Sequence, residues 1–275
     1  MKLFSKVSVL GLAVLFVLGM SGAALAGSIV IKGSTTVLPL AQRAAEEFLK
    51  QHPDVSISVS GGGSGNGIKA LLDGSTDIAD ASRYVKDKEI DMAKGKGIEF
   101  VAHVVALDCV VPVVHPSNNI TNLTLDQLKD IYTGKIVNWK EVGGADKPIV
   151  IISRDTSSGT YEVWYKLVLR KKKVTPRALL QASNGAVAQA VANNKYAIGY
   201  VGIGYLNDDL KGLTVNGIKA TVASARDGSF PVSRELYMFT NGEPTGDTKA
   251  FLDFVKSAEG QKIAEQEGFV ALELK

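Results

Sequence analysis

Cysteine and histidine are scarce in this chain, and their scarcity excludes several kinds of chemistry. Cys109 is the only cysteine among 275 residues, so no internal disulfide can form. Because it lies in the apolar run 104–114, we expect a buried structural thiol rather than a nucleophile. His52, His103 and His115 show no metal-ligand spacing, so the sequence predicts neither a metal site nor a metal cofactor.

The motifs of serine hydrolases and nucleotide-binding proteins are also missing. No serine lies in a G-x-S-x-G motif, and no spacing places a histidine base near a serine. The glycine-rich segment 61–67 is followed by Ile68, which breaks both the G-x-G-x-x-G pattern and the P-loop pattern. We therefore expect a protein that is not an enzyme and does not bind nucleotides.

Acidic residues are absent from positions 1–26, which follow the pattern of a cleaved secretory signal. Lys2 and Lys6 precede an apolar run, and Ala24-Leu25-Ala26 ends the segment. A retained membrane anchor is the alternative interpretation. Without this segment the 31 basic residues fall to 29, against 28 acidic ones, and this balance predicts no nucleic-acid partner. We expect a monomer that is exported to the periplasm.

Strands and helices alternate along the rest of the chain, which predicts an α/β fold with mostly parallel sheets. The expected strands cover 28–32, 55–59, 77–82, 100–114, 149–152, 196–201 and 236–239. The expected helices cover 37–50, 68–72, 125–132, 160–171 and 248–267.

Two of these strands predict a division into two lobes. The run 100–114 is too long for one ordinary strand within one domain, so we expect it to leave the first lobe and enter a second. The apolar segment 236–239 is expected to cross back. Lobe 1 is therefore predicted to comprise 27–109 with 236–275, and lobe 2 to comprise 110–235.

Three turns share one design that suits a compact anion. Residues 33–36, 61–67 and 153–160 each follow an expected strand, are rich in Ser, Thr or Gly, and lead into an expected helix. Helix N-termini present free backbone N–H groups, and glycine lets the backbone approach a ligand. Arg154 in the third turn adds a planar fork of donors. The alternative interpretation is that these turns serve only as helix caps.

Five segments in this order resemble the motifs of phosphate-type periplasmic binding proteins, over nearly the whole mature chain. They are GSTTVLP at 33–39, GGGSGNGIK at 61–69, DIADASR at 77–83, 125–139 with its YTGKI, and RDTSSGT at 154–160. The resemblance implies a two-lobed hinged fold that holds one dehydrated oxyanion between its lobes. The candidate ligand-binding residues are Ser34, Thr35, Thr36, Ser64, Ser82, Arg83, Arg154, Ser158, Gly159 and Thr160.

The chain departs from the family pattern at two positions. Ser82 stands where better-known members have an Asp that accepts the proton of hydrogen phosphate and repels sulfate. Arg83 is similar to a Ser-Arg variant of shorter members and is a candidate second cation. Asp77 and Asp80 are alternative acceptors, although the residue type favours a turn or strand-end role for them. The acid of the third turn is also displaced, to Asp155.

The sequence thus predicts a solute-binding protein that captures inorganic phosphate and delivers it to the permease subunits of an ABC importer. Three alternatives remain open. They are a receptor for sulfate or another tetrahedral oxyanion, a secreted phosphate-ester hydrolase, and a phosphate sensor.

Overall fold

A single mixed sheet runs through the molecule. The computed structural model describes residues 27–273, so the predicted secretory signal at 1–26 lies outside the described residues. The strand order is β2-β1-β3-β11-β4-β8-β6-β7, with β9 also paired to β4 and a separate β10-β5 pair. The strands are β1 Ser28–Gly33, β2 Ser56–Gly61, β3 Ile78–Ala81, β4 Phe100–Val114, β5 Asn122–Leu123, β6 Val150–Arg154, β7 Leu179–Gln181, β8 Ala197–Gly202, β9 Lys211–Gly212, β10 Thr214–Val215 and β11 Ser233–Asn241.

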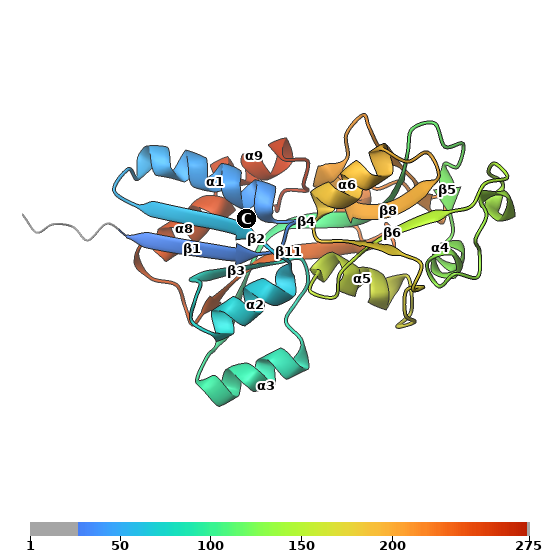
Figure 1. Ribbon diagram of the computed structural model, residues 1–275. Helices are drawn as coiled ribbons and strands as arrows, with labels where there is room; N and C mark the ends of the chain where they lie inside the picture. Colours follow the sequence, from blue (N-terminus) through green and yellow to red (C-terminus); the bar gives the residue numbers. More distant parts are fainter. Residues whose placement is uncertain (1–26, 274–275) are drawn as a thin grey trace, which may run out of the picture.

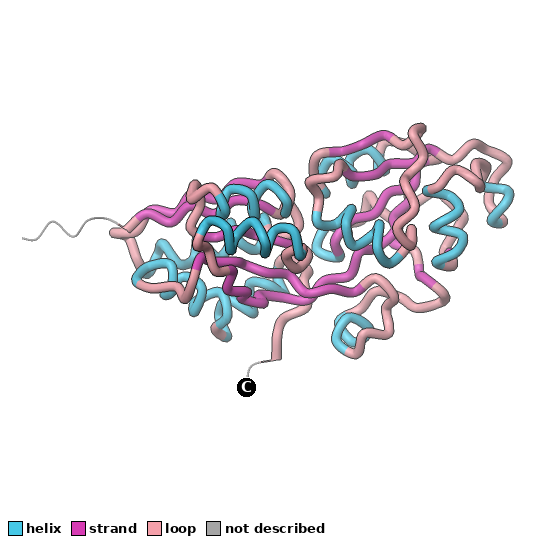
Figure 2. Tube along the Cα trace, turned by 90° about the horizontal axis from the view of Figure 1, so that it is seen from below, coloured by secondary structure: helices cyan, strands magenta, loops and turns pink. Residues whose placement is uncertain are grey.

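Helices cover the sheet in two groups (Figure 1). They are α1 Leu38–Gln51, α2 Ser64–Leu72, α3 Asp87–Lys96, α4 Leu125–Tyr132, α5 Gly159–Leu167, α6 Asn184–Ala192, α7 Val222–Arg226, α8 Gly246–Lys256 and α9 Ala258–Gln266, with short 3₁₀ turns at Trp139–Val142 and Ile203–Tyr205. We call β1–α3 with α8 and α9 the first body, and β5–α7 the second body. Figure 2 shows from below how strands join the two bodies.

Strands β4 and β11 connect the two bodies. The strand expected over 100–114 is confirmed over its full length. Its residues 100–109 pair antiparallel with β11, and its residues 110–114 pair antiparallel with β8. The pairs β1–β2, β1–β3, β6–β7 and β6–β8 are parallel, so the antiparallel strands lie at the centre of the sheet.

Each body has its own apolar core. In the first body, Leu40 and Phe48 of α1 pack in one cluster with Ile29 of β1 and with residues of α8 and α9. In the second body, Tyr132 and Trp164 belong to a cluster that begins at Cys109. Cys109 is buried, as expected, and burial raises the pKa of its thiol to about 12. The chain therefore changes from one core to the other within β4.

The helices expected near 160–171 and 248–267 end differently in the structure. Helix α5 ends at Leu167, and left-handed φ values at Arg170 and Lys171 follow it. The single helix expected over 248–267 is wrong, because the chain becomes extended at Ser257, whose hydroxyl accepts from Gly260 N to cap α9. A Cβ at Gly260 would lie 2.3 Å from two carbonyls of α8, so the two helices meet closely there.

Candidate functional site

The three turns identified in the sequence meet between the two bodies. Thr36 Oγ1 of the first turn lies 3.0 Å from Thr160 Oγ1 of the third, although 124 positions separate them. In the second turn, Gly65 N donates to the carbonyl of Ser157 at 2.9 Å. The seven predicted hydroxyl residues, which we call the hydroxyl cluster, are each at most 6% exposed: Ser34, Thr35, Thr36, Ser64, Ser82, Ser158 and Thr160.

Two hydroxyls of the cluster hold their own turns in place. Ser34 Oγ accepts from Thr36 N at 3.1 Å, so this side chain shapes the approach to α1. Ser158 is the N-cap of α5 and accepts from Tyr161 N at 3.1 Å. Such caps satisfy N–H groups that a helix leaves free, and they fix the direction of the remaining ones.

The second and third turns touch at Ser64, Ser82 and Gly159. Ser64 Oγ accepts from Ser82 N at 3.0 Å and lies 3.3 Å from Ser82 Oγ. A Cβ at Gly159 would lie 2.3 Å from Ser64 Oγ and 2.7 Å from Ser82 Oγ. Since real Cβ atoms do not approach so closely, only glycine allows this contact between the bodies.

Arg154 is buried, and its guanidinium is partly free. Nε donates to the carbonyl of Gln181 and NH2 donates to the carbonyl of Ala182, both at 3.0 Å. NH1 is buried and has no partner among residues 27–273. Burial lowers the pKa of this group, but an arginine stays charged in a protein. Arg154 therefore keeps a charged donor group that the described residues do not use.

The guanidinium of Arg83 is paired with Glu89 on α3. NH1 and NH2 each donate to one carboxylate oxygen of Glu89 at 2.8 Å. Burial raises the pKa of Glu89, but the hydrogen bonds from Arg83 and the Lys86 backbone lower it below its usual value. One complete edge of the Arg83 fork is thus occupied by Glu89.

The three aspartates weighed from the sequence have different surroundings. Asp77 accepts from Val30 N at 2.7 Å, which is the strand-end role that was one of its two interpretations. Asp155 accepts from Ser157 N at 2.8 Å within the third turn. Asp80 is 1% exposed, its Oδ1 has no partner among the described residues, and burial raises its pKa well above the usual range.

Three buried residues that sequence reasoning missed join the cluster. Asn184, the first residue of α6, donates to Thr35 Oγ1 at 3.1 Å and to Thr36 Oγ1 at 3.0 Å. Arg234 on β11 forms an ion pair with Asp108 on β4 at 2.6 Å. The signal for Asn184 was present, because Ser183-Asn184-Gly185 resembles the other capped turns. Arg234 carried no such signal.

Hydrogen-bond counting shows a surplus of donors in the cluster. Thr36 Oγ1 accepts from Asn184 Nδ2 at 3.0 Å and from Arg234 NH2 at 3.2 Å, and either hydroxyl can donate across its 3.0 Å contact with Thr160 Oγ1. Thr160 Oγ1 also accepts from Arg234, so whichever of the two hydroxyls donates to the other, the proton of the second has no acceptor among the described residues. With NH1 of Arg154, the cluster offers buried donors that suit a ligand made of acceptors, such as an oxyanion.

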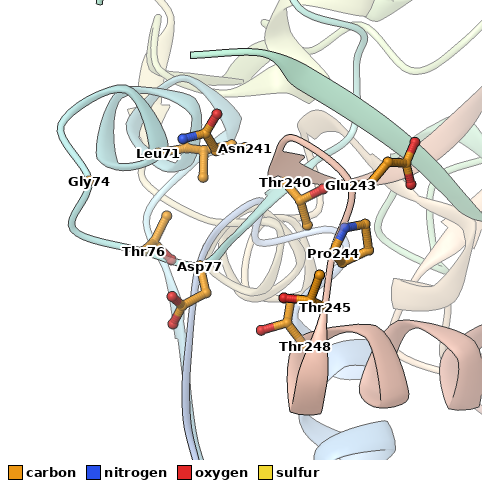
Figure 3. A pocket seen from close by; sticks show the side chains of 10 residues that line it. All are labelled: Leu71, Gly74, Thr76, Asp77, Thr240, Asn241, Glu243, Pro244, Thr245 and Thr248. Atoms are coloured by element: carbon orange, nitrogen blue, oxygen red, sulfur yellow. The ribbon is translucent and has the colours of Figure 1, made fainter. Parts of the chain in front are cut away.

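Another polar pocket lies apart from the hydroxyl cluster. A polar pocket of about 330 Å³ lies in the first body, where Asp77 and Thr76 face Thr245 and Thr248 (Figure 3). It contains no residue of the hydroxyl cluster. Within residues 27–273, no three His, Cys, Asp or Glu side chains gather as metal ligands. In the same range, no helix combines the length and apolar character needed to cross a membrane.

This fold and its buried cluster define the class of the protein. The family model described as a PBP superfamily domain matches residues 20–259. The chain therefore belongs to the PBP superfamily, and the predicted α/β binding-protein fold is confirmed.

Similar proteins include several that are named phosphate-binding proteins. The phosphate-binding protein PstS of Bacillus subtilis (strain 168) is 35% identical over 246 residues, which are 89% of this chain and 80% of the relative. The chain is thus a member of the PstS family. Its relatives are named as receptors and not as enzymes, which agrees with the prediction from the sequence.

Solved structures agree with this assignment. A phosphate ABC transporter substrate-binding protein with bound phosphate from Clostridium perfringens is 36% identical and has a TM-score of 0.83, over 90% of this chain and 100% of that chain. An ABC-type phosphate transport receptor from Vibrio cholerae is 32% identical, with a TM-score of 0.73 over 89% of this chain and 100% of that chain.

Proposed function

We propose that this protein captures inorganic phosphate outside the cytoplasm and delivers it to the membrane subunits of an ABC importer. The surplus of buried donors between the two bodies carries this proposal, because phosphate offers several acceptor oxygens and a negative charge. The names of the relatives, which include a structure with bound phosphate, favour phosphate over sulfate.

The two bodies act as hinged lobes in this proposal. Lobe 1 is 27–109 with 236–275, and lobe 2 is 110–235. The hinge lies where β4 and β11 pass between the bodies, at the register that pairs Ser233 with Cys109. Rotation about two strands can open the contact between the turns while each core stays intact, as in other hinged receptors.

The ligand is held from both lobes. Lobe 1 provides the turn with Ser34, Thr35 and Thr36, together with Ser64 and Ser82. Lobe 2 provides Arg154 and the start of α5 at Ser158, Gly159 and Thr160. The helix N-termini add positive potential that an anion needs once water is excluded. Arg83 borders this site near Gly65, where its ion pair with Glu89 holds the guanidinium in place. Its positive charge would add to the attraction for the anion.

The partners and location follow from the same proposal. A signal at 1–26 would export the chain to the periplasm, where it would act as a monomer that has no nucleic-acid partner. The permease would recognise the closed form. A phosphate sensor would use the same closure without transport, so uptake in a deletion strain separates these two roles.

Calorimetric titration of the ligand-stripped protein tests this function. We expect tight one-to-one binding of phosphate, and weaker binding of sulfate. Arg154→Ala should lose about 2–5 kcal/mol of phosphate affinity, because a buried anion loses a charged partner. Arg43→Ala is the control, since Arg43 makes only exposed ion pairs on α1. Tighter binding of sulfate than of phosphate would contradict the choice of ligand.

A further inference from the structure

Arg234 lies at the point where the two bodies join. It is on β11, and its Cα partner on β4 is Asp108, one position before the chain enters the second core. Both side chains are buried, at 5% and 0% exposure. The two strands that carry this pair are those that pass between the bodies (Figure 1).

One edge of the Arg234 guanidinium is fixed by Asp108. Nε lies 2.7 Å and NH2 lies 2.6 Å from the same oxygen, Oδ2. The other oxygen of Asp108 accepts from Ile203 N at 2.8 Å, so the carboxylate is itself held by the second body. Burial raises the pKa of Asp108, and the charge of Arg234 opposes that shift.

The opposite edge of Arg234 faces the hydroxyl cluster. NH1 and NH2 each lie 3.2 Å from Thr160 Oγ1, NH2 lies 3.2 Å from Thr36 Oγ1, and NH1 also donates to the carbonyl of Ser82 at 3.2 Å. These contacts are longer than the ion pair, and the two hydroxyls already have other hydrogen-bond partners. The NH1–NH2 edge is one of the edges with which arginine forms paired N–H···O bonds to the oxygens of a carboxylate or phosphate.

The other buried arginine–carboxylate pair lacks this arrangement. NH1 and NH2 of Arg83 both donate to Glu89, whereas NH1 and NH2 of Arg234 lie toward Thr36 and Thr160. Buried ion pairs add little net stability compared with apolar residues, so stability alone does not account for a charged pair at the centre of the sheet.

We infer that Arg234 is a ligand-binding residue, which supplies a second guanidinium to the oxyanion from the hinge strands. Asp108 orients the guanidinium, and among the described residues the opposite edge makes only the 3.2 Å contacts to Thr36, Thr160 and Ser82, which ligand oxygens would replace. This inference rests on the proposed function. It places a second cation, in addition to Arg154, on the strands that join the lobes.

The test compares charge removal at this pair with the same change elsewhere. Arg234→Gln alone would leave Asp108 buried without a partner, so the main variant combines Asp108→Asn with Arg234→Gln. Arg226→Gln is the control, since Arg226 contacts the carbonyl of Ala271 and no residue of the hydroxyl cluster. Phosphate binding is measured by calorimetry, and folding by thermal unfolding.

We expect the double variant to keep a cooperative unfolding transition. It should bind phosphate about 100-fold more weakly, because the buried anion loses one charged partner. Arg234→Lys, which keeps the charge without the fork, should fall between it and the wild type. Wild-type affinity in the double variant would overturn the role of Arg234 and leave the proposed function intact.

Two further outcomes are decisive. If the double variant fails to fold, wild-type affinity in Arg234→Lys overturns the inference, and a loss of about tenfold or more supports it. If the wild type itself binds no phosphate, while its unfolding shows that it is folded, the proposed function falls and this inference falls with it.

Discussion

Gly159→Ala is the sharpest test of closure between the two bodies. The new methyl carbon would lie 2.3 Å from Ser64 Oγ, 2.9 Å from Ser64 Cβ and 2.7 Å from Ser82 Oγ. Ser64 cannot simply rotate away, because its hydroxyl accepts from Ser82 N at 3.0 Å. The colliding atoms belong to the other body, so the clash arises only when the bodies close.

The expected cost follows from this overlap. Ordinary contacts need about 1 Å more space than these, and forcing an extra methyl group into a packed site costs about 1–3 kcal/mol. That corresponds to a roughly 5- to 150-fold loss of phosphate affinity. Since each body folds around its own core, the unfolding temperature should change little. Calorimetry and thermal unfolding of one preparation measure both quantities.

Two other glycines calibrate the result. A Cβ at Gly65 would lie 3.2 Å from the carbonyl of Ser157, so Gly65→Ala should weaken binding less than Gly159→Ala. A Cβ at Gly95 on α3 would meet nothing within 4 Å, so Gly95→Ala should leave binding unchanged. Equal phosphate affinity in all three variants would refute the closed contact between the turns.

Two predictions concern ionisable groups. Asp80 keeps its proton in the folded protein at pH values where the unfolded chain, with a pKa of about 3.9, loses it. The contribution of Asp80 to stability therefore falls as pH rises above about 4, and Asp80→Asn should become more stable than the wild type by about 1–3 kcal/mol at neutral pH. Urea unfolding at pH 4 and pH 7 checks this, and a difference independent of pH would contradict it. The half-buried ion pair of Lys86 with Glu162 links the two bodies. Lys86→Gln should therefore release labelled phosphate a few-fold faster, in keeping with about 0.5–1 kcal/mol for such a pair. An unchanged release rate would show that the pair does not hold the closed form.

The predicted and observed elements agree best where local signals are strong. Thr124 and Gln127 form the capping box that starts α4, and the expected helix 125–132 matches the observed one. The division of 248–267 into α8 and α9 was missed, because a helical apolar pattern continues through Ser257. The break depends on the close packing of Gly260 against α8, which no local pattern reports.

In the candidate site too, local sequence patterns identified some residues, and contacts between distant residues identified the others. The turns with Thr36, Ser64 and Thr160 were found because Ser, Thr and Gly before a helix have a local physical meaning. Arg234 was missed because it lies on an ordinary strand, 126 positions from the Asp108 that anchors it. Arg83 was singled out from its neighbours, yet its fork is occupied by Glu89 on the next helix.

The sequence by itself determined many of the elements, the anion-suited turns and the likeness to phosphate receptors, because each depends on residues adjacent in the chain. Only the tertiary structure decided which donors face one another. Strand pairing sets Arg234 opposite Asp108, and closure of the bodies sets Thr36 beside Thr160. The donor surplus arises from these distant contacts, since a hydroxyl or guanidinium is free or occupied only once the fold has chosen its partners.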